Sequence, residues 1–147
     1  MNRAACTEAL LAAKAERGLS FADLAATVGR SEVWTAAVVF GQAQMDVTEA
    51  EALAGALGLG PEVEGALRQH PMRGSLDAAV PVDPLLYRFH EITQVYGTTI
   101  KALINEKFGE GIMSAIDFEM TIERAEDPKG DRVIVTYNGK FLPYRKW

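Results

Sequence analysis

The chain has 147 residues, which suits one large domain or two small ones. Hydrophobic residues make up 48% and charged residues 24%, values that exclude a disordered or collagen-like chain. The net charge of -5 arises within residues 1–84, because residues 85–147 carry nine acidic and nine basic side chains. An acidic surplus disfavours both a nucleic-acid reader and a protein of anionic membrane surfaces.

The apolar runs and the few cysteine and histidine residues indicate where the protein is found and which kinds of metal site it lacks. The longest uncharged apolar run, Val33 to Phe40, is too short to span a bilayer, and the first residues carry no export signal. Cys6 is the single cysteine, so no intramolecular disulfide and no cysteine-based zinc site is expected. With only His70 and His90 present, a histidine-rich metal centre is also excluded. We therefore expect a soluble cytoplasmic protein that holds no metal.

Five short helices are predicted over residues 1–70, from apolar residues at three- and four-residue spacing between glycine stops. They are a first helix through Leu10 and Lys14 that ends at Gly18, Phe21–Val28 with Ser20 as N-cap, Glu32–Phe40 with Ser31 as N-cap, Glu49–Leu57 with Thr48 as N-cap, and Glu62–Arg68 after Pro61. Such short helices predict a compact bundle.

The second and third of these helices resemble the core of a repressor-type helix-turn-helix domain. A working recognition helix needs Arg, Lys, Asn or Gln at its exposed start. Here the helix begins Ser31-Glu32-Val33-Trp34, with one carboxylate and apolar residues. We therefore expect the fold of a DNA-binding domain without its function.

Residues 71–84 are rich in proline and predict an extended linker that packs on a neighbour. Residues 85–147 predict a catalytic and oligomerisation domain of helix and β-hairpin, so the whole chain is expected to be α+β. Asp83-Pro84 starts a helix, Gly97 interrupts it, and Thr98 caps a second helix through Lys107. A strand follows from Ala115.

The hairpin prediction rests on alternation and on turn residues. Apolar residues alternate with polar ones in Ile116–Glu123, the pattern of a half-buried strand. Residues 127–131 predict a turn, Arg132–Tyr137 a second strand, and Asn138-Gly139 a further turn. An isolated hairpin is only marginally stable and leaves strand edges exposed, so we expect obligate oligomerisation through this half.

Three residues of the second half are candidates for chemistry. Arg88 and Glu91 stand three apart on one helix, which places them on one face. A solvated surface ion pair is the common outcome of this spacing, but the apolar residues around them predict an interface. Ser114 follows Gly109-Glu110-Gly111, where backbone amides and the hydroxyl suit a small anion. The simpler interpretation of Ser114 is a serine that bonds its own backbone.

Three stretches carry a resemblance to a known family: Asp83–Ile92, Lys101–Phe118 and Asn138–Tyr144. Together they resemble the signatures of cyanase, also called cyanate hydratase or cyanate lyase. The first half is similar more loosely, at Gly41-Gln42 and at Thr48–Glu51.

The resemblance implies a hydro-lyase that converts cyanate, with bicarbonate as co-substrate and no cofactor, into ammonia and carbon dioxide through carbamate. It implies roles in cyanate detoxification and nitrogen metabolism. The family's catalytic arginine, glutamate and serine fall on Arg88, Glu91 and Ser114, and its anion-site backbone positions fall on Ala115 and Leu142. It also implies a homodecamer of five dimers whose active sites are built from several chains. Departures such as His90 and Asp117 leave the three catalytic residue types intact.

Physical chemistry is compatible with this assignment. Cyanate and bicarbonate repel each other, so joining them requires fixed positive charge and donor groups in a dry site. Arg88 would bind the anions, Ser114 would orient one of them, and Glu91 would hold Arg88 and relay a proton.

Three alternatives remain open from the sequence. A helix-turn-helix regulator would bind DNA with a steep salt dependence. A catalytically dead scaffold would form a ring without turnover. A lyase for another small anion would keep the same residues with a different substrate.

Overall fold

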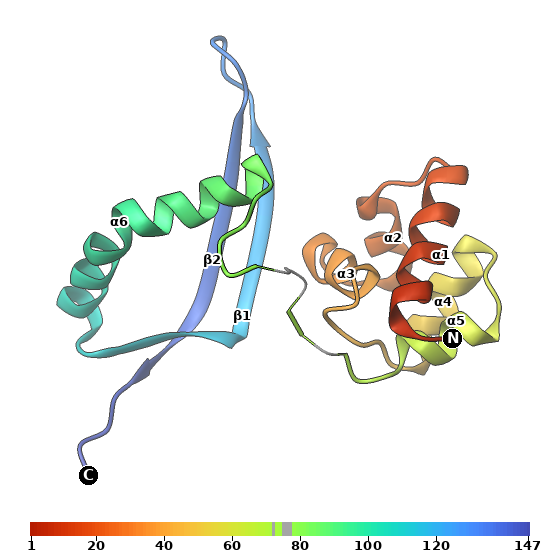
Figure 1. The fold of residues 1–147 in the computed structure, drawn as a ribbon, viewed down its shortest axis with the longest axis horizontal. Helices are drawn as coiled ribbons and strands as arrows, with labels where there is room; N and C mark the ends of the chain where they lie inside the picture. The colour runs from red at the N-terminus through yellow and green to blue at the C-terminus, as the bar shows by residue number, and fades with distance from the viewer. Residues whose placement is uncertain (72, 75–77) are drawn as a thin grey trace. The chain divides into compact units, whose positions relative to one another are not determined.

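The chain forms two units in the computed structural model, which describes residues 1–71, 73–74 and 78–147. The first unit spans Met1–Ser75 and consists of helices, and the second spans Leu76–Trp147 and holds one helix and a two-stranded sheet (Figure 1). The predicted α+β class is therefore confirmed. The division falls inside the predicted linker 71–84, of which residues 72 and 75–77 lie outside the described residues.

The first unit contains the five predicted helices around one apolar core. They are α1 (Arg3–Glu16), α2 (Phe21–Val28), α3 (Glu32–Val39), α4 (Val47–Leu57) and α5 (Pro61–Leu67). Every helix contributes fully buried side chains, among them Leu10, Leu24, Val38, Leu53 and Leu67. Their burial is the main stabilising contribution to this unit.

Most predicted helix ends lie within one residue of those in the structure, and the start of α4 differs by two residues. Ser20 caps α2 in a capping box with Asp23, as its position predicted. The prediction that Thr48 caps the fourth helix is wrong, because the N-cap residue of α4 is Asp46, two residues earlier. The Asp46 carboxylate accepts from the Glu49 amide at 2.9 Å, and the Glu49 carboxylate accepts from the Asp46 amide at 2.9 Å.

Hydrogen bonds tie the last residue of α5 and the chain that follows it to the loop between α3 and α4. The Met45 amide donates to the Leu67 carbonyl at 3.0 Å, and the Gly74 amide donates to Gln42 Oε1 at 2.7 Å. Nδ1 of His70 lies 2.5 Å from Gln44 Oε1. The start of the predicted linker is thus bound to the first unit. Between α5 and α6, the described residues form no helix or strand.

One long helix, α6 (Pro84–Phe108), replaces the two helices predicted for the second unit. Asp83 caps it by accepting from the amides of Leu85 and Leu86 at 2.9 and 3.0 Å. The prediction of a break at Gly97 is wrong. Glycine costs about 1 kcal/mol in a helix relative to alanine, which weakens a 25-residue helix without ending it. Figure 1 shows that α6 bends along its length.

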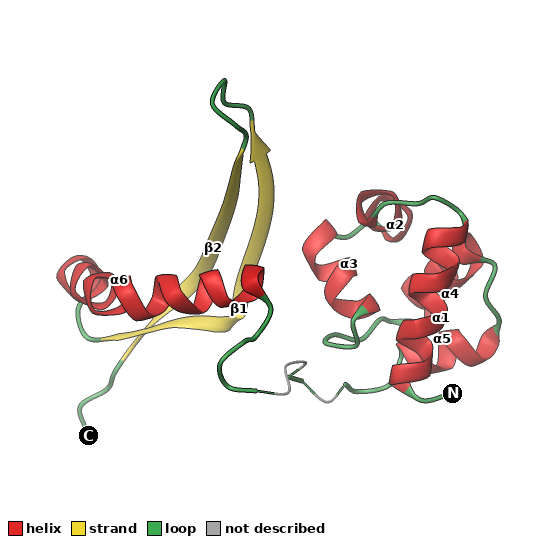
Figure 2. Cartoon of the chain, turned by 45° about the horizontal axis from the view of Figure 1, so that its top comes forward, coloured by secondary structure: helices red, strands yellow, loops and turns green. Residues whose placement is uncertain are grey.

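Strands β1 (Gly111–Ala125) and β2 (Arg132–Pro143) form one antiparallel hairpin, drawn in yellow in Figure 2. The strand β1 starts four residues before the predicted start. The turn predicted at Asn138-Gly139 is wrong, since β2 runs through both residues. The turn predicted at residues 127–131 is confirmed, with the Lys129 amide bonded to Asp127 at 2.8 Å.

A bulge interrupts the pairing of the two strands. Met113 pairs with Phe141, but the next pair is Phe118 with Gly139. Four residues of β1, 114–117, therefore lie opposite Lys140 alone. This bulge contains Ser114 and Ala115.

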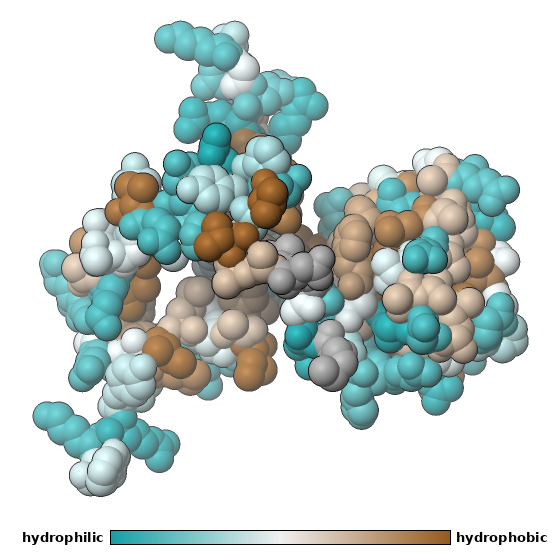
Figure 3. Space-filling model, in the orientation of Figure 1, coloured by the Kyte–Doolittle hydropathy of each residue, from teal (hydrophilic) through white to brown (hydrophobic). Residues whose placement is uncertain are grey.

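The second unit buries almost nothing within one chain. Ser114 is the one buried residue among those described in Leu76–Trp147, and α6 has none. The predicted half-buried face of β1 is only partly present in a single chain: Phe118 and Met120 are partly buried, whereas Ile116 and Ile122 are 97% and 56% exposed. Figure 3 shows brown hydrophobic side chains on the visible surface of this unit, whereas the hairpin tip is teal. No described helix has the length and apolar character needed to cross a membrane.

Candidate active site

Arg88 and Glu91 form an ion pair on the first turns of α6. Nη1 of Arg88 lies 3.3 Å from Oε2 of Glu91, as the spacing of three residues predicts. Their side chains are 64% and 47% exposed, so the prediction that they are buried in an interface is not met within one chain. The contact with Glu91 uses one nitrogen of the Arg88 fork, and the exposed guanidinium keeps other donors for an anion.

The aromatic ring of Tyr87 lies beside this pair. The Arg88 guanidinium is 5.9 Å from the centroid of the Tyr87 ring, within the range of a cation–π interaction. The His90 ring also lies near Tyr87, with the two ring centroids 5.9 Å apart. His90, a position where the sequence departs from the resemblance, therefore packs against Tyr87, and Tyr87 in turn lies near Arg88.

Ser114 is buried in the bulge of β1, with 6% of its surface exposed. Its Oγ accepts hydrogen bonds from the backbone amides of Ile116 at 3.1 Å and Asp117 at 2.9 Å. The simpler interpretation of Ser114, a serine bonded to its own backbone, is thus correct for its acceptor atoms. A hydroxyl also has a donor hydrogen, for which the described hydrogen bonds contain no acceptor. That hydrogen can be donated to a further acceptor.

Sequence reasoning did not place two charged residues at this bulge, Asp117 within it and Lys140 opposite it. Lys140 extends from β2 opposite residues 114–117, and its Nζ lies 3.9 Å from Oδ2 of Asp117. Both side chains are exposed. The alternation of β1 contains no signal for a bulge, so nothing in the sequence placed a lysine next to Ser114.

The predicted site residues fall into two groups within one chain. Leu142 pairs with Ile112, two residues before Ser114, so the hairpin brings Leu142 near Ser114 and Ala115. Arg88 and Glu91 form the second group on α6. No hydrogen bond or ion pair among the described residues joins the groups. A single chain therefore presents both parts of the predicted site without a polar contact between them.

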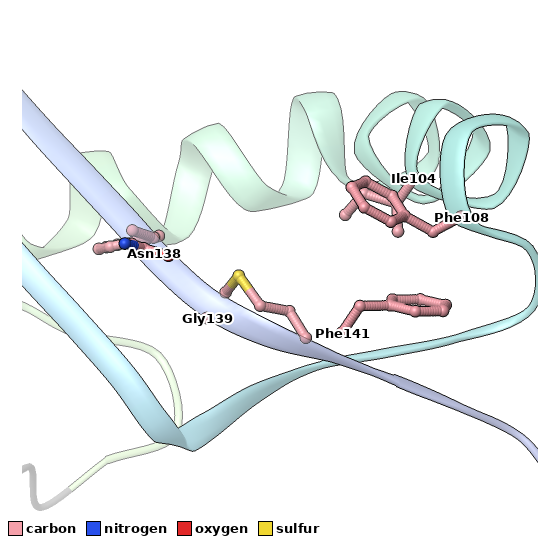
Figure 4. Close-up of a pocket in the computed structure, with 7 residues that line it drawn as sticks. Ile104, Phe108, Asn138, Gly139 and Phe141 are labelled. Carbon is pink, nitrogen blue, oxygen red and sulfur yellow. The ribbon is translucent and has the colours of Figure 1, made fainter.

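A cavity of about 310 Å³ separates the C-terminal part of α6 from the hairpin (Figure 4). Its lining is Ile104, Phe108, Met113, Tyr137, Asn138, Gly139 and Phe141. The rings of Phe108 and Phe141 lie 5.2 Å apart at one end. This lining is mostly apolar and holds no charged side chain, which does not suit a small anion. None of the five predicted site residues lines it.

Within the described ranges, no group of three or more His, Cys, Asp or Glu side chains is arranged to hold a metal ion.

Comparisons with known proteins cover both units. The family model "Cyanate hydratase, N-terminal" matches residues 3–71, and "Cyanate lyase C-terminal domain" matches residues 78–146. A cyanate hydratase of Acaryochloris marina is 56% identical over 147 residues, covering 100% of both chains. One from a Synechococcus strain is 57% identical over 141 residues, covering 96% of this chain and 94% of that relative.

A solved structure shares the fold. The crystal structure of cyanase from T. urticae has a TM-score of 0.83 and 37% sequence identity, covering 94% of this chain and 96% of the other. Both the similarity in sequence and the similarity in fold extend over nearly the whole chain.

Proposed function

This chain belongs to the cyanate hydratase family, and from that membership we propose that it is a cyanate hydratase that decomposes cyanate with bicarbonate as co-substrate. The observation that carries the proposal is the Arg88–Glu91 pair, at 3.3 Å and open to solvent on α6. It is a charged donor set that can accept a small anion without displacing a buried partner. The single cysteine suits the reducing cytoplasm.

Arg88 is proposed to bind the substrate anions. A guanidinium presents parallel N–H donors that match two oxygens of bicarbonate, and its charge offsets the repulsion between bicarbonate and cyanate. A bicarbonate oxygen then attacks the cyanate carbon and forms a C–O bond. The negative charge that develops is stabilised by the same donors.

Glu91 is proposed to orient Arg88 and to relay a proton to the cyanate nitrogen. Cleavage of the adduct releases carbon dioxide and leaves carbamate. Carbamate takes up a further proton and separates into ammonia and a second carbon dioxide without help from the protein. The sum consumes two protons for each cyanate and bicarbonate.

Ser114 and the backbone around it are proposed to position one of the anions. The support is the orientation of the Ser114 hydroxyl, whose oxygen is held by two backbone amides and whose hydrogen has no partner among the described groups. Ala115 and Leu142 would line the same place with backbone groups. Lys140 adds positive charge at the bulge.

The complete site is proposed to form between copies of the chain, in the decamer of five dimers that the resemblance implies. Two observations support this. The polar groups on α6 and on the hairpin are not joined within one chain, and α6 leaves many large apolar side chains at least 37% exposed. They are Leu85, Leu86, Tyr87, Phe89, Ile92, Val95, Tyr96, Ile100, Leu103 and Phe108. Exposed apolar area of this kind marks an interface.

The test is ammonia release from cyanate, with and without added bicarbonate, by the wild-type chain and by Arg88→Ala. Arg124→Ala is the matched control, because Arg124 pairs with Asp131 at the hairpin turn. We expect bicarbonate-dependent release that Arg88→Ala abolishes and Arg124→Ala keeps. Light scattering on the same samples should give ten copies. An assembled wild-type protein that releases no ammonia contradicts the proposed function.

A further inference from the structure

Gly139 lies on β2 at the edge of the bulge that contains Ser114. Gly139 pairs with Phe118, the first residue of β1 after the bulge. Along β2, it directly precedes Lys140, the residue opposite the bulge. Its backbone φ is not among the positive values found at other glycines of the chain. Any residue can adopt a backbone conformation without a positive φ. A requirement for glycine at this position must therefore come from a lack of room for a side chain.

The space at Gly139 is occupied by the backbone of the bulge. A Cβ atom added to Gly139 would lie 2.5 Å from the carbonyl oxygen of Ser114. It would also lie 2.6 Å from Cγ and 3.2 Å from Sδ of Met113. Real Cβ atoms essentially never approach other heavy atoms within 3.0 Å, so something must move. The Met113 side chain can rotate away, but the Ser114 carbonyl can move only with the backbone of Ser114.

From this contact we propose that Gly139 is a positioning residue that holds Ser114 in place for the reaction. The inference rests on the proposed function, in which Ser114 binds an anion. A side chain at position 139 displaces the Ser114 carbonyl and with it the hydroxyl. The hydrogen bonds from the amides of Ile116 and Asp117 to Ser114 Oγ, at 3.1 and 2.9 Å, are then lost or lengthened.

The test compares Gly139→Ala with Gly55→Ala in the full chain. Gly55 lies inside α4, and a Cβ added there would meet nothing within 4 Å. We expect Gly139→Ala to lower kcat/KM for cyanate by on the order of 10- to 100-fold, because small misplacements of catalytic groups have effects of that size. Gly55→Ala should keep wild-type kcat/KM, and both variants should keep the wild-type mass by light scattering.

A second readout follows the position of Ser114 without using activity. Hydrogen exchange followed by mass spectrometry should show faster exchange in peptides that contain Ile116 and Asp117 in Gly139→Ala only. If the wild-type chain does not act on cyanate, the proposed function fails, yet this exchange measurement still tests the positioning of Ser114. Unchanged exchange in Gly139→Ala would overturn the inference, and so would loss of assembly, which would make Gly139 a residue of the fold.

A double variant separates the two contacts of Gly139. In Met113→Ala/Gly139→Ala the side-chain contact is removed, and the contact with the Ser114 carbonyl remains. We expect kcat/KM for cyanate in the double variant to be at least about 10-fold lower than in Met113→Ala, an effect on the order of that of Gly139→Ala alone. Recovery to the level of Met113→Ala would show that the methionine contact was the cause, and would overturn the role assigned to Ser114.

Discussion

The Arg88 side chain both pairs with Glu91 and, in the proposed reaction, binds the substrate anions. Its ion pair with Glu91 is exposed, and exposed pairs contribute little to stability. The pair is therefore available for binding and need not be kept for folding. The spacing of three residues predicted the pair, but the sequence could not show that both side chains stay open within a single chain.

Replacing Arg88 with lysine keeps the positive charge but removes the planar guanidinium, so it separates the effects of these two properties. We expect Arg88→Lys to reduce kcat/KM for cyanate by about 100-fold, because an ammonium cannot make two parallel hydrogen bonds to one anion. Ammonia release at saturating bicarbonate measures it, with Arg124→Lys as the control. Near-normal turnover by Arg88→Lys would show that charge alone suffices.

Cys6 gives a pH dependence to the first unit. The side chain is fully buried, and burial raises the pKa of the Cys6 thiol above its ordinary value of 9.0, against the opposing effect of Arg3. The unfolded chain therefore releases this proton at lower pH than the folded chain. The stabilising contribution is complete below pH 9.0 and is lost as the pH rises toward the folded pKa.

Urea unfolding of wild type and Cys6→Ala across neutral to alkaline pH measures this effect. The free energy of unfolding of the wild type should fall more steeply above pH 9.0 than that of Cys6→Ala. The variant is expected to be less stable at neutral pH, so the comparison concerns the slopes and not the absolute values. Parallel slopes would rule out Cys6 as the group responsible.

At the scale of whole elements, the start of α4 shows where local patterns stop being decisive. Asp46 and Thr48 both precede a glutamate by three residues, so both fit a capping box. The structure selects Asp46, and its partner Glu49 is 8% exposed with Oε1 2.5 Å from Nε of Arg30. That contact comes from a residue 19 positions earlier, which no local pattern contains.

Alanine substitutions distinguish the two caps. Asp46→Ala should lower the free energy of unfolding of the first unit by about 1 kcal/mol, because the Glu49 amide loses its acceptor. Thr48→Ala should change it by a few tenths of a kcal/mol, since Thr48 lies inside the first turn of α4. Denaturant midpoints at constant slope measure both. A larger loss for Thr48→Ala than for Asp46→Ala would contradict the assigned cap.

Two of the wrong predictions in the second unit, both made at glycines, have a common physical cause. Sequence pattern predicts breaks at Gly97 and at Asn138-Gly139, because glycine favours turns and ends helices in isolation. In the structure α6 and β2 run through them, and Gly139 serves the close approach to Ser114 instead. The need for space around a glycine depends on a neighbouring strand, so the sequence pattern could not distinguish the two uses.

At the scale of the whole chain, the two units differ in how much apolar surface each one buries by itself. The buried apolar core belongs to the first unit, which spans Met1–Ser75. Composition and helical periodicity were enough to predict this bundle, because its stabilising contacts lie within 75 residues of sequence. The site could be predicted only in its residue types, since its two groups are not joined within one chain.

The first unit should therefore fold by itself. A fragment of residues 1–75 is expected to give a helical circular dichroism spectrum and one cooperative thermal transition, because all its described core residues are present. Leu53→Ala in this fragment should lower its free energy of unfolding by about 2–5 kcal/mol, since Leu53 is fully buried. A gradual, non-cooperative melt of the fragment would contradict this independence.

The scarcity of buried residues in α6 and the hairpin also determines the order of events during synthesis. The first unit leaves the ribosome first and can fold on its own contacts. The second unit emerges with exposed apolar side chains and two open strand edges. In the proposed assembly, its folding waits for collisions with other copies of the chain. The rate of that step rises with the number of chains present. If that assembly forms as proposed, a cell that makes few copies holds half-folded chains for longer, and these chains are exposed to chaperones and proteases.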